Sequence, residues 1–202
     1  MRIRLLPDLD RELSTRNPLI VTIPEVLSPA ECAAFIERME GEGLTDAPIT
    51  TNRGFVMRKD IRNNTRVMFD DPVFAQRLFE RVKAHLPERV EGTLVAVGAN
   101  ERLRCYRYAP GQYFAPHFDG FFRRDDGDES QLTLMVYLNE VERGGHTVFT
   151  DLELDVKPVR GMALLFNHRL LHEGAEVLAG IKYAVRSDVM FRARASQRVN
   201  AA

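Results

Sequence analysis

KYAVRSDVMF (residues 182–191) has the alternation of a β-strand with two unlike faces. Its apolar face carries Tyr183, Val185, Val189 and Phe191. Its other face carries Lys182, Ala184, Arg186 and Asp188. The apolar face has the composition of a core, whereas burying the charged face would be costly unless a partner occupied the space in front of it. We therefore expect this strand to separate a hydrophobic core from a ligand pocket.

Short β-like runs also fill the rest of the chain after residue 90. They are TLVAV (93–97), LRCYRY (103–108), LTLMVYL (132–138), TVFT (147–150), ELDVKPV (153–159) and MALLF (162–166). Turn signals separate them at Pro110-Gly111, Asp126-Gly127, Gly144-Gly145 and Gly161. Many short strands with regular turns predict a sandwich or barrel. We expect an antiparallel jelly roll, whose open mouth between two sheets can hold a ligand.

Two helices are expected before this β-rich region. Ser28 fits an N-cap, with Pro29 in the first helical position and Glu31 completing a capping box. Cys32, Phe35, Ile36 and Met39 form the apolar stripe of this helix, which Gly41 can end. A second helix follows Asp71-Pro72 with the stripe Phe74, Leu78, Phe79 and Val82, and ends by Pro87.

The N-terminal part is expected to support the jelly roll from outside. Residues 1–18 are predicted to form a lead-in arm, and LIVTIP (19–24) a short strand. With 202 residues and 23.1 kDa, the chain has the size of a single domain. We divide residues 1–202 into a support region, 1–99, and a jelly-roll core, 100–192. The predicted class is therefore mainly β with flanking helices.

Charge and composition exclude several function classes. A net charge of −1 argues against a nucleic-acid partner, since such proteins are usually strongly basic. The two cysteines, Cys32 and Cys105, are too few for a disulfide scaffold or a cysteine-rich zinc site, and we expect reduced thiols. No signal peptide or membrane span is apparent, which predicts a soluble, cytoplasmic protein without a membrane partner. The sequence leaves the oligomeric state open.

Two polar segments have two interpretations each. Residues 51–71 are locally basic through Arg53, Arg58, Lys59, Arg62 and Arg66. They form either a solvated loop or edge strand, or a flap that touches an acidic or polar substrate. DGFFRRDDGDES (119–130) is either a solvated hairpin connection or a substrate-contact loop that forms a second jaw with residues 51–66.

Three side chains suggest a metal site. His117 and Asp119 are two residues apart, so an extended backbone would project them to the same side. His172 follows the strand-like MALLF. Two histidines and one carboxylate form the facial triad of non-haem Fe(II) oxygenases, which leaves positions open on the metal. A dicarboxylate ligand would balance the charged face of residues 182–188, with a cationic side chain at its far end.

Six ordered motifs resemble those of a known family, the Fe(II)/2-oxoglutarate-dependent oxygenases, in their prolyl 4-hydroxylase-like branch. They are RYAPGQYFAPHFDG (107–120), LTLMVYLN (132–139), GGHTVF (144–149), KPVRGMALLF (157–166), HEG (172–174) and KYAVRSDVMF (182–191). The resemblance covers about residues 100–192. It implies a double-stranded β-helix, the cupin-like jelly roll, and a dioxygenase that uses Fe(II), 2-oxoglutarate and O2, with ascorbate as a further candidate.

The resemblance also assigns roles to individual residues. It implies that His117, Asp119 and His172 bind the iron, and that Lys182 pairs with the distal carboxylate of 2-oxoglutarate. It implies cosubstrate hydrogen bonds from Tyr108 and Tyr137, for which simple aromatic packing is the alternative. No catalytic residue beyond the metal ligands is predicted.

Several nearby residues keep open roles. Arg186 either contacts cosubstrate or substrate, or forms a salt bridge near Asp188. The family commonly has an acidic residue where His146 stands, and we interpret His146 as a loop residue rather than a substrate-side group. His168 is predicted to be structural or substrate-facing, not a ligand. Candidate apolar walls are Phe114, Phe118, Phe121, Leu134 and Phe166.

Three functions are compatible with the sequence. The leading one is hydroxylation of an aliphatic C–H bond in a prolyl or other amino-acid residue of a peptide, or in a small molecule. The second is demethylation of a nucleic acid or small molecule by the same chemistry, which the neutral charge disfavours for nucleic acids. The third is a non-catalytic jelly-roll binding module. Formation of succinate separates the third from the other two.

Overall fold

The computed structural model describes residues 2–8, 11–51 and 54–193, and its largest element is a nine-stranded antiparallel sheet. Eight strands follow one another in the order β1-β2-β14-β10-β17-β8-β6-β3, and β7 also pairs with β17. Their bounds are Arg4–Leu5 (β1), Ile20–Ile23 (β2), Ala163–Asn167 (β14), Glu129–Tyr137 (β10), Lys182–Ala193 (β17), Arg102–Tyr108 (β8), Thr65–Asp70 (β6), Thr45–Asp46 (β3) and Leu94–Ala99 (β7).

A smaller sheet faces the large one. It has the order β13-β12-β15-β9, with bounds Leu154–Val156, Thr147–Phe149, His172–Gly174 and Phe114–His117. Two ribbons flank it, one formed by β11 (Arg143–Gly144) with β16 (Val177–Ala179), the other by β4 (Ile49–Thr51) with β5 (Gly54–Val56). Two 3-10 turns, Lys83–His85 and Thr150–Leu152, complete the elements. The two facing sheets form the predicted jelly roll.

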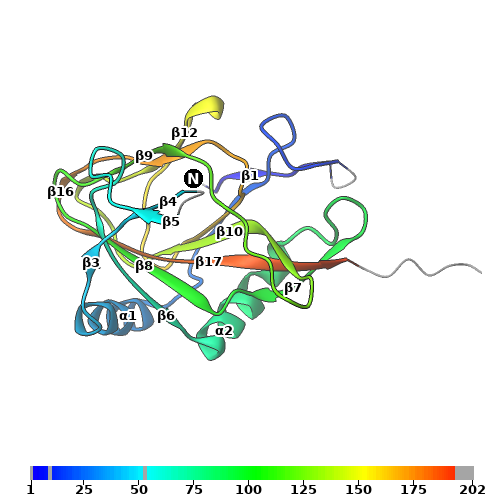
Figure 1. Cartoon of the computed structure of the whole chain (residues 1–202), viewed down its shortest axis with the longest axis horizontal. Helices are drawn as coiled ribbons and strands as arrows, with labels where there is room; N and C mark the ends of the chain where they lie inside the picture. The colour runs from blue at the N-terminus through cyan, green and yellow to red at the C-terminus, as the bar shows by residue number, and fades with distance from the viewer. Residues whose placement is uncertain (1, 9–10, 52–53, 194–202) are drawn as a thin grey trace, which may run out of the picture.

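The two faces of the large sheet have different tasks. Along β10, Leu132, Leu134 and Val136 belong to the main core, together with the apolar sides of both helices. Figure 1 shows the helices on one side of the large sheet and the smaller sheet, with β9 and β12, on the other. Thr133 and Met135 alternate with these core residues and line a cavity between the sheets. The sheet therefore separates the core from a pocket, as the alternation predicted.

Both predicted helices are present where their caps indicated. Helix α1 spans Pro29–Gly41, and Ser28 and Glu31 form the reciprocal bonds of a capping box. Helix α2 spans Pro72–Val82, and the Asp71 carboxylate accepts the backbone N–H of Phe74. Their apolar stripes lie in the main core. The helices therefore support the back of the sheet whose front carries the pocket.

The N-terminal region does more than support the jelly roll. Strand β1 lies in the predicted lead-in arm, β2 pairs with β14, and β6, from the basic stretch, pairs with β8. Residues before 100 thus contribute strands to the same sheet as residues after it. The division at residue 99 remains a prediction about organisation. Asn52 and Arg53 of the basic stretch lie outside the described residues.

Two further expectations concern the compartment. Cys32 and Cys105 are both buried and free, in agreement with reduced thiols. In the described part of the chain, no helix is long and apolar enough to cross a membrane. The cytoplasmic location remains a prediction.

Candidate active site

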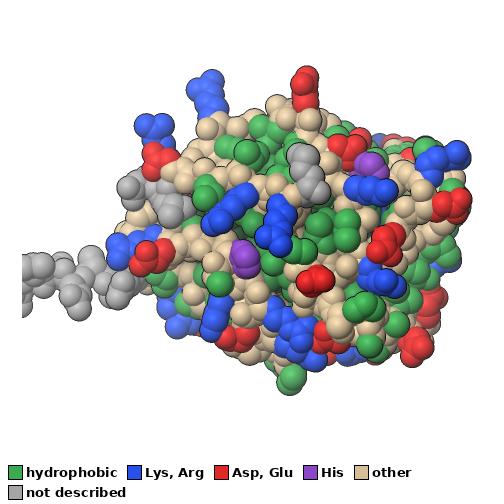
Figure 2. All heavy atoms as spheres, turned by 180° about the vertical axis from the view of Figure 1, so that it is seen from behind, with side chains coloured by type: hydrophobic (Ala, Val, Ile, Leu, Met, Phe, Trp, Pro, Cys, Tyr) green, Lys and Arg blue, Asp and Glu red, His purple; other side chains and the backbone are tan. Residues whose placement is uncertain are grey.

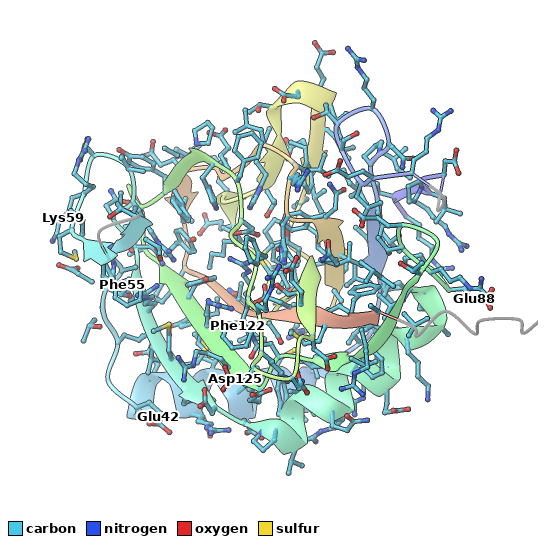
Figure 3. All side chains as sticks on the ribbon, turned by 45° about the vertical axis from the view of Figure 1, so that its right-hand side comes forward. Glu42, Phe55, Lys59, Glu88, Phe122 and Asp125 are labelled. Carbon is cyan, nitrogen blue, oxygen red and sulfur yellow. The ribbon has the colours of Figure 1, made fainter. Side chains whose placement is uncertain are left out.

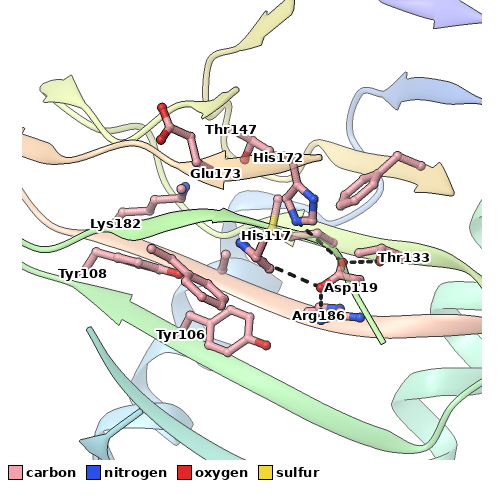
Figure 4. Close-up of a pocket in the computed structure, with 15 residues that line it drawn as sticks. Tyr106, Tyr108, His117, Asp119, Thr133, Thr147, His172, Glu173, Lys182 and Arg186 are labelled. Carbon is pink, nitrogen blue, oxygen red and sulfur yellow. Dashed lines mark hydrogen bonds and ion pairs between the residues drawn. The ribbon is translucent and has the colours of Figure 1, made fainter. Parts of the chain in front are cut away.

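Three side chains of metal-ligand type meet between the two sheets. Antiparallel pairing of β9 with β15 sets His117 directly opposite His172, and their ring centroids lie 4.3 Å apart. Asp119 follows β9 and completes the group (Figure 4). One potential ligand atom from each residue lies within 4.8 Å of the others. The register of one strand pair therefore brings the three predicted residues together.

Hydrogen bonds orient both imidazoles. The Nδ1 atom of His117 lies 2.9 Å from the carbonyl oxygen of Ala115, and that of His172 lies 2.9 Å from the carbonyl oxygen of Leu170. A carbonyl can only accept, so each Nδ1 carries the proton and each Nε2 keeps a lone pair. Burial lowers the pKa of His117 to about 3, and burial also lowers the pKa of His172. Both rings are therefore neutral at pH 7, the form that binds a metal.

Asp119 is held as a carboxylate. Burial by itself would raise its pKa, but the Arg186 guanidinium and the two imidazoles of the triad lower the pKa below its ordinary value. Arg186 Nη1 lies 2.6 Å from one carboxylate oxygen, and the Thr133 hydroxyl donates to the other at 2.6 Å. The side chain is thus ionised and fixed in orientation, as a metal ligand requires.

This donor set fits ferrous iron. Two neutral imidazoles and one carboxylate are the ligands of non-haem Fe(II) oxygenases. The triad lies in a cavity that is also lined by Lys182 and Tyr108. Part of the remaining space is lined by Thr147, Glu173 and Gly174 of the smaller sheet. His117, Asp119 and His172 would hold the ion through three ligands, so other coordination positions would remain for a small molecule bound in the same cavity.

Lys182 lies in the same cavity as a buried cation without a counter-charge. Its residue is 3% exposed, and no carboxylate of the described residues forms an ion pair with it. Its ammonium lies 5.3 Å from the centre of the Tyr108 ring and 5.5 Å from that of Tyr137. Burial lowers the pKa of Lys182 to about 7. An anionic group bound in the cavity would relieve this cost.

The two tyrosines of the prediction differ in their surroundings. Tyr108 pairs with Lys182 across β8 and β17 and lines the cavity. Burial raises its pKa to about 12, so its hydroxyl stays a donor. Tyr137 is completely buried, and its hydroxyl donates to Thr147 at 2.7 Å. Cosubstrate contacts remain predictions for both, although Tyr137 already has a protein partner.

For Arg186 the sequence left open a ligand contact or a salt bridge, and the structure shows salt bridges. Besides Asp119, it reaches Asp188 at 2.9 Å, and it also lines the cavity. Its role toward a cosubstrate remains a prediction.

The candidate apolar walls divide into three groups. Phe114 and Phe166 line the cavity. Phe118 and Phe121 are 60% and 64% exposed and do not line this cavity, although Phe118 lines a second cavity beside it. The assignment of Leu134 is wrong because this residue points into the main core on the opposite face of β10.

Several lining residues were not found from the sequence. They are Tyr106, Thr133, Met135, Thr147 and Glu173. Strand alternation was the available signal for the first three. Tyr106 is two residues from Tyr108 and points to the same face of β8. Thr133 and Met135 likewise share one face of β10 with Tyr137. Thr147 and Glu173 belong to the motifs GGHTVF and HEG, but strand alternation does not place them in the cavity, because their positions depend on how the smaller sheet packs.

His146 and His168 lie outside the triad. His146 contacts Asp155 at 2.7 Å and is partly exposed in the connection before β12. His168 is buried within a chain of hydrogen bonds. Its Nε2 lies 2.9 Å from the Ser130 hydroxyl, and its Nδ1 lies 3.0 Å from the Thr133 hydroxyl. Because Thr133 donates to Asp119, it must accept from His168, which is therefore the Nδ1-protonated tautomer.

We expect His168→Phe to weaken metal binding without removing a metal ligand. Phenylalanine fills a similar volume but leaves Thr133 without its donor, so Asp119 loses part of its orientation. Outer partners of this kind typically contribute 10- to 100-fold in metal affinity. Calorimetric titration with Fe(II) under anaerobic conditions measures the effect. An unchanged affinity in a folded variant would show that the hydrogen-bond chain does not position Asp119.

The two predicted jaws have unequal roles. From the first predicted jaw, residues 51–66, Ile61, Arg62 and Arg66 line a second cavity beside the triad, together with Ile49 and Thr50 just before that segment. In the other segment, Arg123 pairs with Glu129 and Arg124 with Glu101. Figure 3 shows Phe55 and Lys59 on the β4–β5 side, apart from Phe122 and Asp125 on the other segment. The arginines of residues 119–130 therefore have protein partners of their own, and only the start of this segment reaches the second cavity.

Comparisons with known proteins agree with this geometry. The model of the 2OG-Fe(II) oxygenase superfamily matches residues 103–187. Prolyl 4-hydroxylase 1 of Arabidopsis thaliana is 26% identical over 200 residues, which cover 86% of this chain and 69% of that protein. The solved 2OG complex of a viral collagen prolyl hydroxylase from Paramecium Bursaria Chlorella virus-1 is 25% identical, with a TM-score of 0.64 over 85% of this chain and 94% of that one.

A prolyl-4-hydroxylase of Pseudomonas putida shares the fold, with 21% identity and a TM-score of 0.57 over 87% of this chain and 92% of that one. The chain belongs to the 2OG-Fe(II) oxygenase superfamily, whose members use Fe(II), 2-oxoglutarate and O2. Within the superfamily it belongs to the prolyl hydroxylase-like branch, and it is a dioxygenase.

Proposed function

We propose that this enzyme hydroxylates an aliphatic C–H bond, either in a prolyl or other amino-acid residue of a peptide or in a small molecule. The observation that carries the proposal is the shared cavity. The ligand atoms of the triad lie within 4.8 Å of one another, and Lys182, which has no ion-pair partner in the described part of the chain, lines the same cavity. The prolyl 4-hydroxylases among its relatives favour a peptide.

Each part of the cavity has a task in this reaction. His117, Asp119 and His172 would hold the iron, which together with 2-oxoglutarate and O2 supplies the oxidising power for C–H hydroxylation. Lys182 would bind the distal carboxylate of 2-oxoglutarate and so fix its orientation. The protonated hydroxyl of Tyr108 can donate a hydrogen bond to the same cosubstrate. Phe114 and Phe166 keep this part of the pocket apolar and exclude water.

The test is turnover of 2-oxoglutarate to succinate by the iron-loaded enzyme, with and without proline-containing peptides. We expect slow succinate formation without substrate. A peptide substrate would accelerate it and gain the mass of one oxygen atom. Absence of succinate under all conditions would favour a binding module instead.

Nucleic-acid demethylation receives no support from the net charge, although the basic stretch between Arg53 and Arg66 would suit a polyanion. The net charge is −1, and Figure 2 shows basic and acidic side chains interspersed on the face that it presents. A demethylase for single-stranded DNA would be retained on that polymer in a salt-dependent way.

A further inference from the structure

A second cavity opens onto the triad. It shares Tyr106, Phe114, His117, Asp119 and Arg186 with the cavity that contains Lys182. Its own walls come from β4, the segment before β6, and the start of the segment after β9. If the proposed function holds, the substrate can approach the triad through this second cavity while 2-oxoglutarate occupies the first.

The charge of this second cavity is one-sided. Among the described residues that line it, four are arginines and one, Asp119, is acidic. Arg186 pairs with Asp119 and Asp188, and Arg104 pairs with Asp188 at 2.9 Å. These two arginines are therefore neutralised by the protein. The remaining two, Arg62 and Arg66, form no ion pair with any carboxylate of the described residues.

Arg62 is the more deeply placed of the two. The residue is 5% exposed, and its Nη2 atom is buried without a hydrogen-bond partner. Its Nε donates to the Asn64 side chain at 2.7 Å. The guanidinium lies 4.4 Å from the centre of the Phe114 ring and 4.7 Å from that of Tyr106. Two aromatic rings and an amide thus hold this cation in place, while the N–H groups of Nη2 remain free to donate hydrogen bonds to a ligand.

Arg66 adds a second cation on the neighbouring strand. It lies opposite Tyr106 in the β6–β8 pair and is 9% exposed. Burial and the neighbouring Arg62 and Arg104 lower its pKa. Its guanidinium also lies 5.5 Å from the centre of the Phe55 ring. Burying two cations next to each other costs free energy through desolvation and repulsion, and a bound anion would offset this cost.

We propose that Arg62 and Arg66 bind a carboxylate of the substrate and so select acidic substrates for the triad. A guanidinium presents parallel N–H donors that match the two oxygens of a carboxylate. The carboxylate is either the C-terminus of a short peptide or free amino acid, or the side chain of an acidic residue near the hydroxylated position. The inference rests on the proposed function for its substrate, but the anion site itself does not depend on turnover.

Two pairs of probes test the proposal and distinguish these sources. The first pair is glycyl-proline with a free carboxylate and the same dipeptide as its C-terminal amide. The second pair is a blocked pentapeptide with glutamate beside proline and its glutamine counterpart. Binding is measured by calorimetry with the enzyme loaded with Fe(II) and 2-oxoglutarate in the absence of oxygen. In at least one pair, we expect the carboxylate form to bind about tenfold more tightly or better.

Arg66→Gln is the main variant, since it removes the charge at the rim of the arginine pair. It should abolish the preference for the carboxylate. The thermal midpoint of the free protein should stay the same or rise, because an unpaired buried charge disappears. A purely structural arginine would instead lower that midpoint. Arg62→Gln serves as a second variant, and Arg58→Gln, an exposed arginine paired with Asp60, is the matched control.

Equal binding of charged and neutral probes, binding of neither, or a preference that survives in Arg66→Gln would each overturn the proposal. Failure of the proposed function looks different. In that case no succinate would form, while the acidic probes would still bind more tightly. Normal succinate formation without any preference for carboxylates would leave the oxygenase intact and remove only this anion site.

Discussion

Substituting alanine for His172 is expected to lower 2-oxoglutarate turnover by at least about 100-fold and to remove tight Fe(II) binding. The imidazole faces His117 across one strand pair and presents its unprotonated Nε2 to the centre of the triad. Alanine leaves two ligands, which cannot complete a facial triad. Anaerobic calorimetry with Fe(II) measures the affinity, and succinate formation measures the turnover.

His146→Ala is the matched control for this experiment. His146 contacts Asp155 and lies outside the group formed by His117, Asp119 and His172. Its variant should bind iron as the unchanged protein does. His168 is not a suitable control, since its hydrogen bonds lead to Asp119 through Thr133. Retention of iron affinity and turnover in folded His172→Ala would remove the triad as the metal site.

The second large effect is expected for Lys182→Met. Methionine keeps most of the volume and removes the charge, so the KM for 2-oxoglutarate should rise by about 100-fold or more, since a buried ion pair with the cosubstrate is lost. Of the four lysines in the chain, this is the one buried beside the triad. Lys157→Met, at an exposed lysine, should leave the KM unchanged. An unaltered KM in Lys182→Met would place the distal carboxylate elsewhere.

The same lysine predicts a pH dependence. Burial lowers the pKa of Lys182 to about 7 in the free protein, and only the protonated ammonium attracts a carboxylate. The dissociation constant of 2-oxoglutarate should therefore be lowest below pH 7 and should rise as the pH passes through this pKa. Lys182→Met should lose this rise as well as the affinity. Calorimetric titrations between pH 6 and about pH 9 follow both effects.

Local pattern was sufficient for the elements with a strong periodicity. The alternation of residues 182–191 placed Lys182 and Arg186 on the pocket face and Val185 on the core face, and strand β17 has this arrangement. Capping signals likewise located the start of both helices. These features depend on contacts between residues close in the chain, so the sequence contains them directly.

Short strands of the smaller sheet were beyond such patterns. Strands β9 and β15 have four and three residues and were not among the predicted runs. So short a segment is stabilised by its neighbours rather than by its own propensity. The error at Leu134 has a different origin. Leu134 and Tyr137 are three residues apart in β10, so their side chains point to opposite faces of the strand. The two residues therefore cannot both face the same cavity.

By itself, the sequence determined which residues can carry the chemistry and on which face of a strand each one lies. Only the tertiary structure decided which faces meet. The pairing of β9 with β15 set His117 against His172, and the packing of the sheets gave Arg186 its partner Asp119. The approach of β6 to β8 buried Arg66 without an ion-pair partner among the described residues. The reason is physical. Side-chain direction follows from the local backbone, whereas register and packing follow from contacts between segments far apart in the chain.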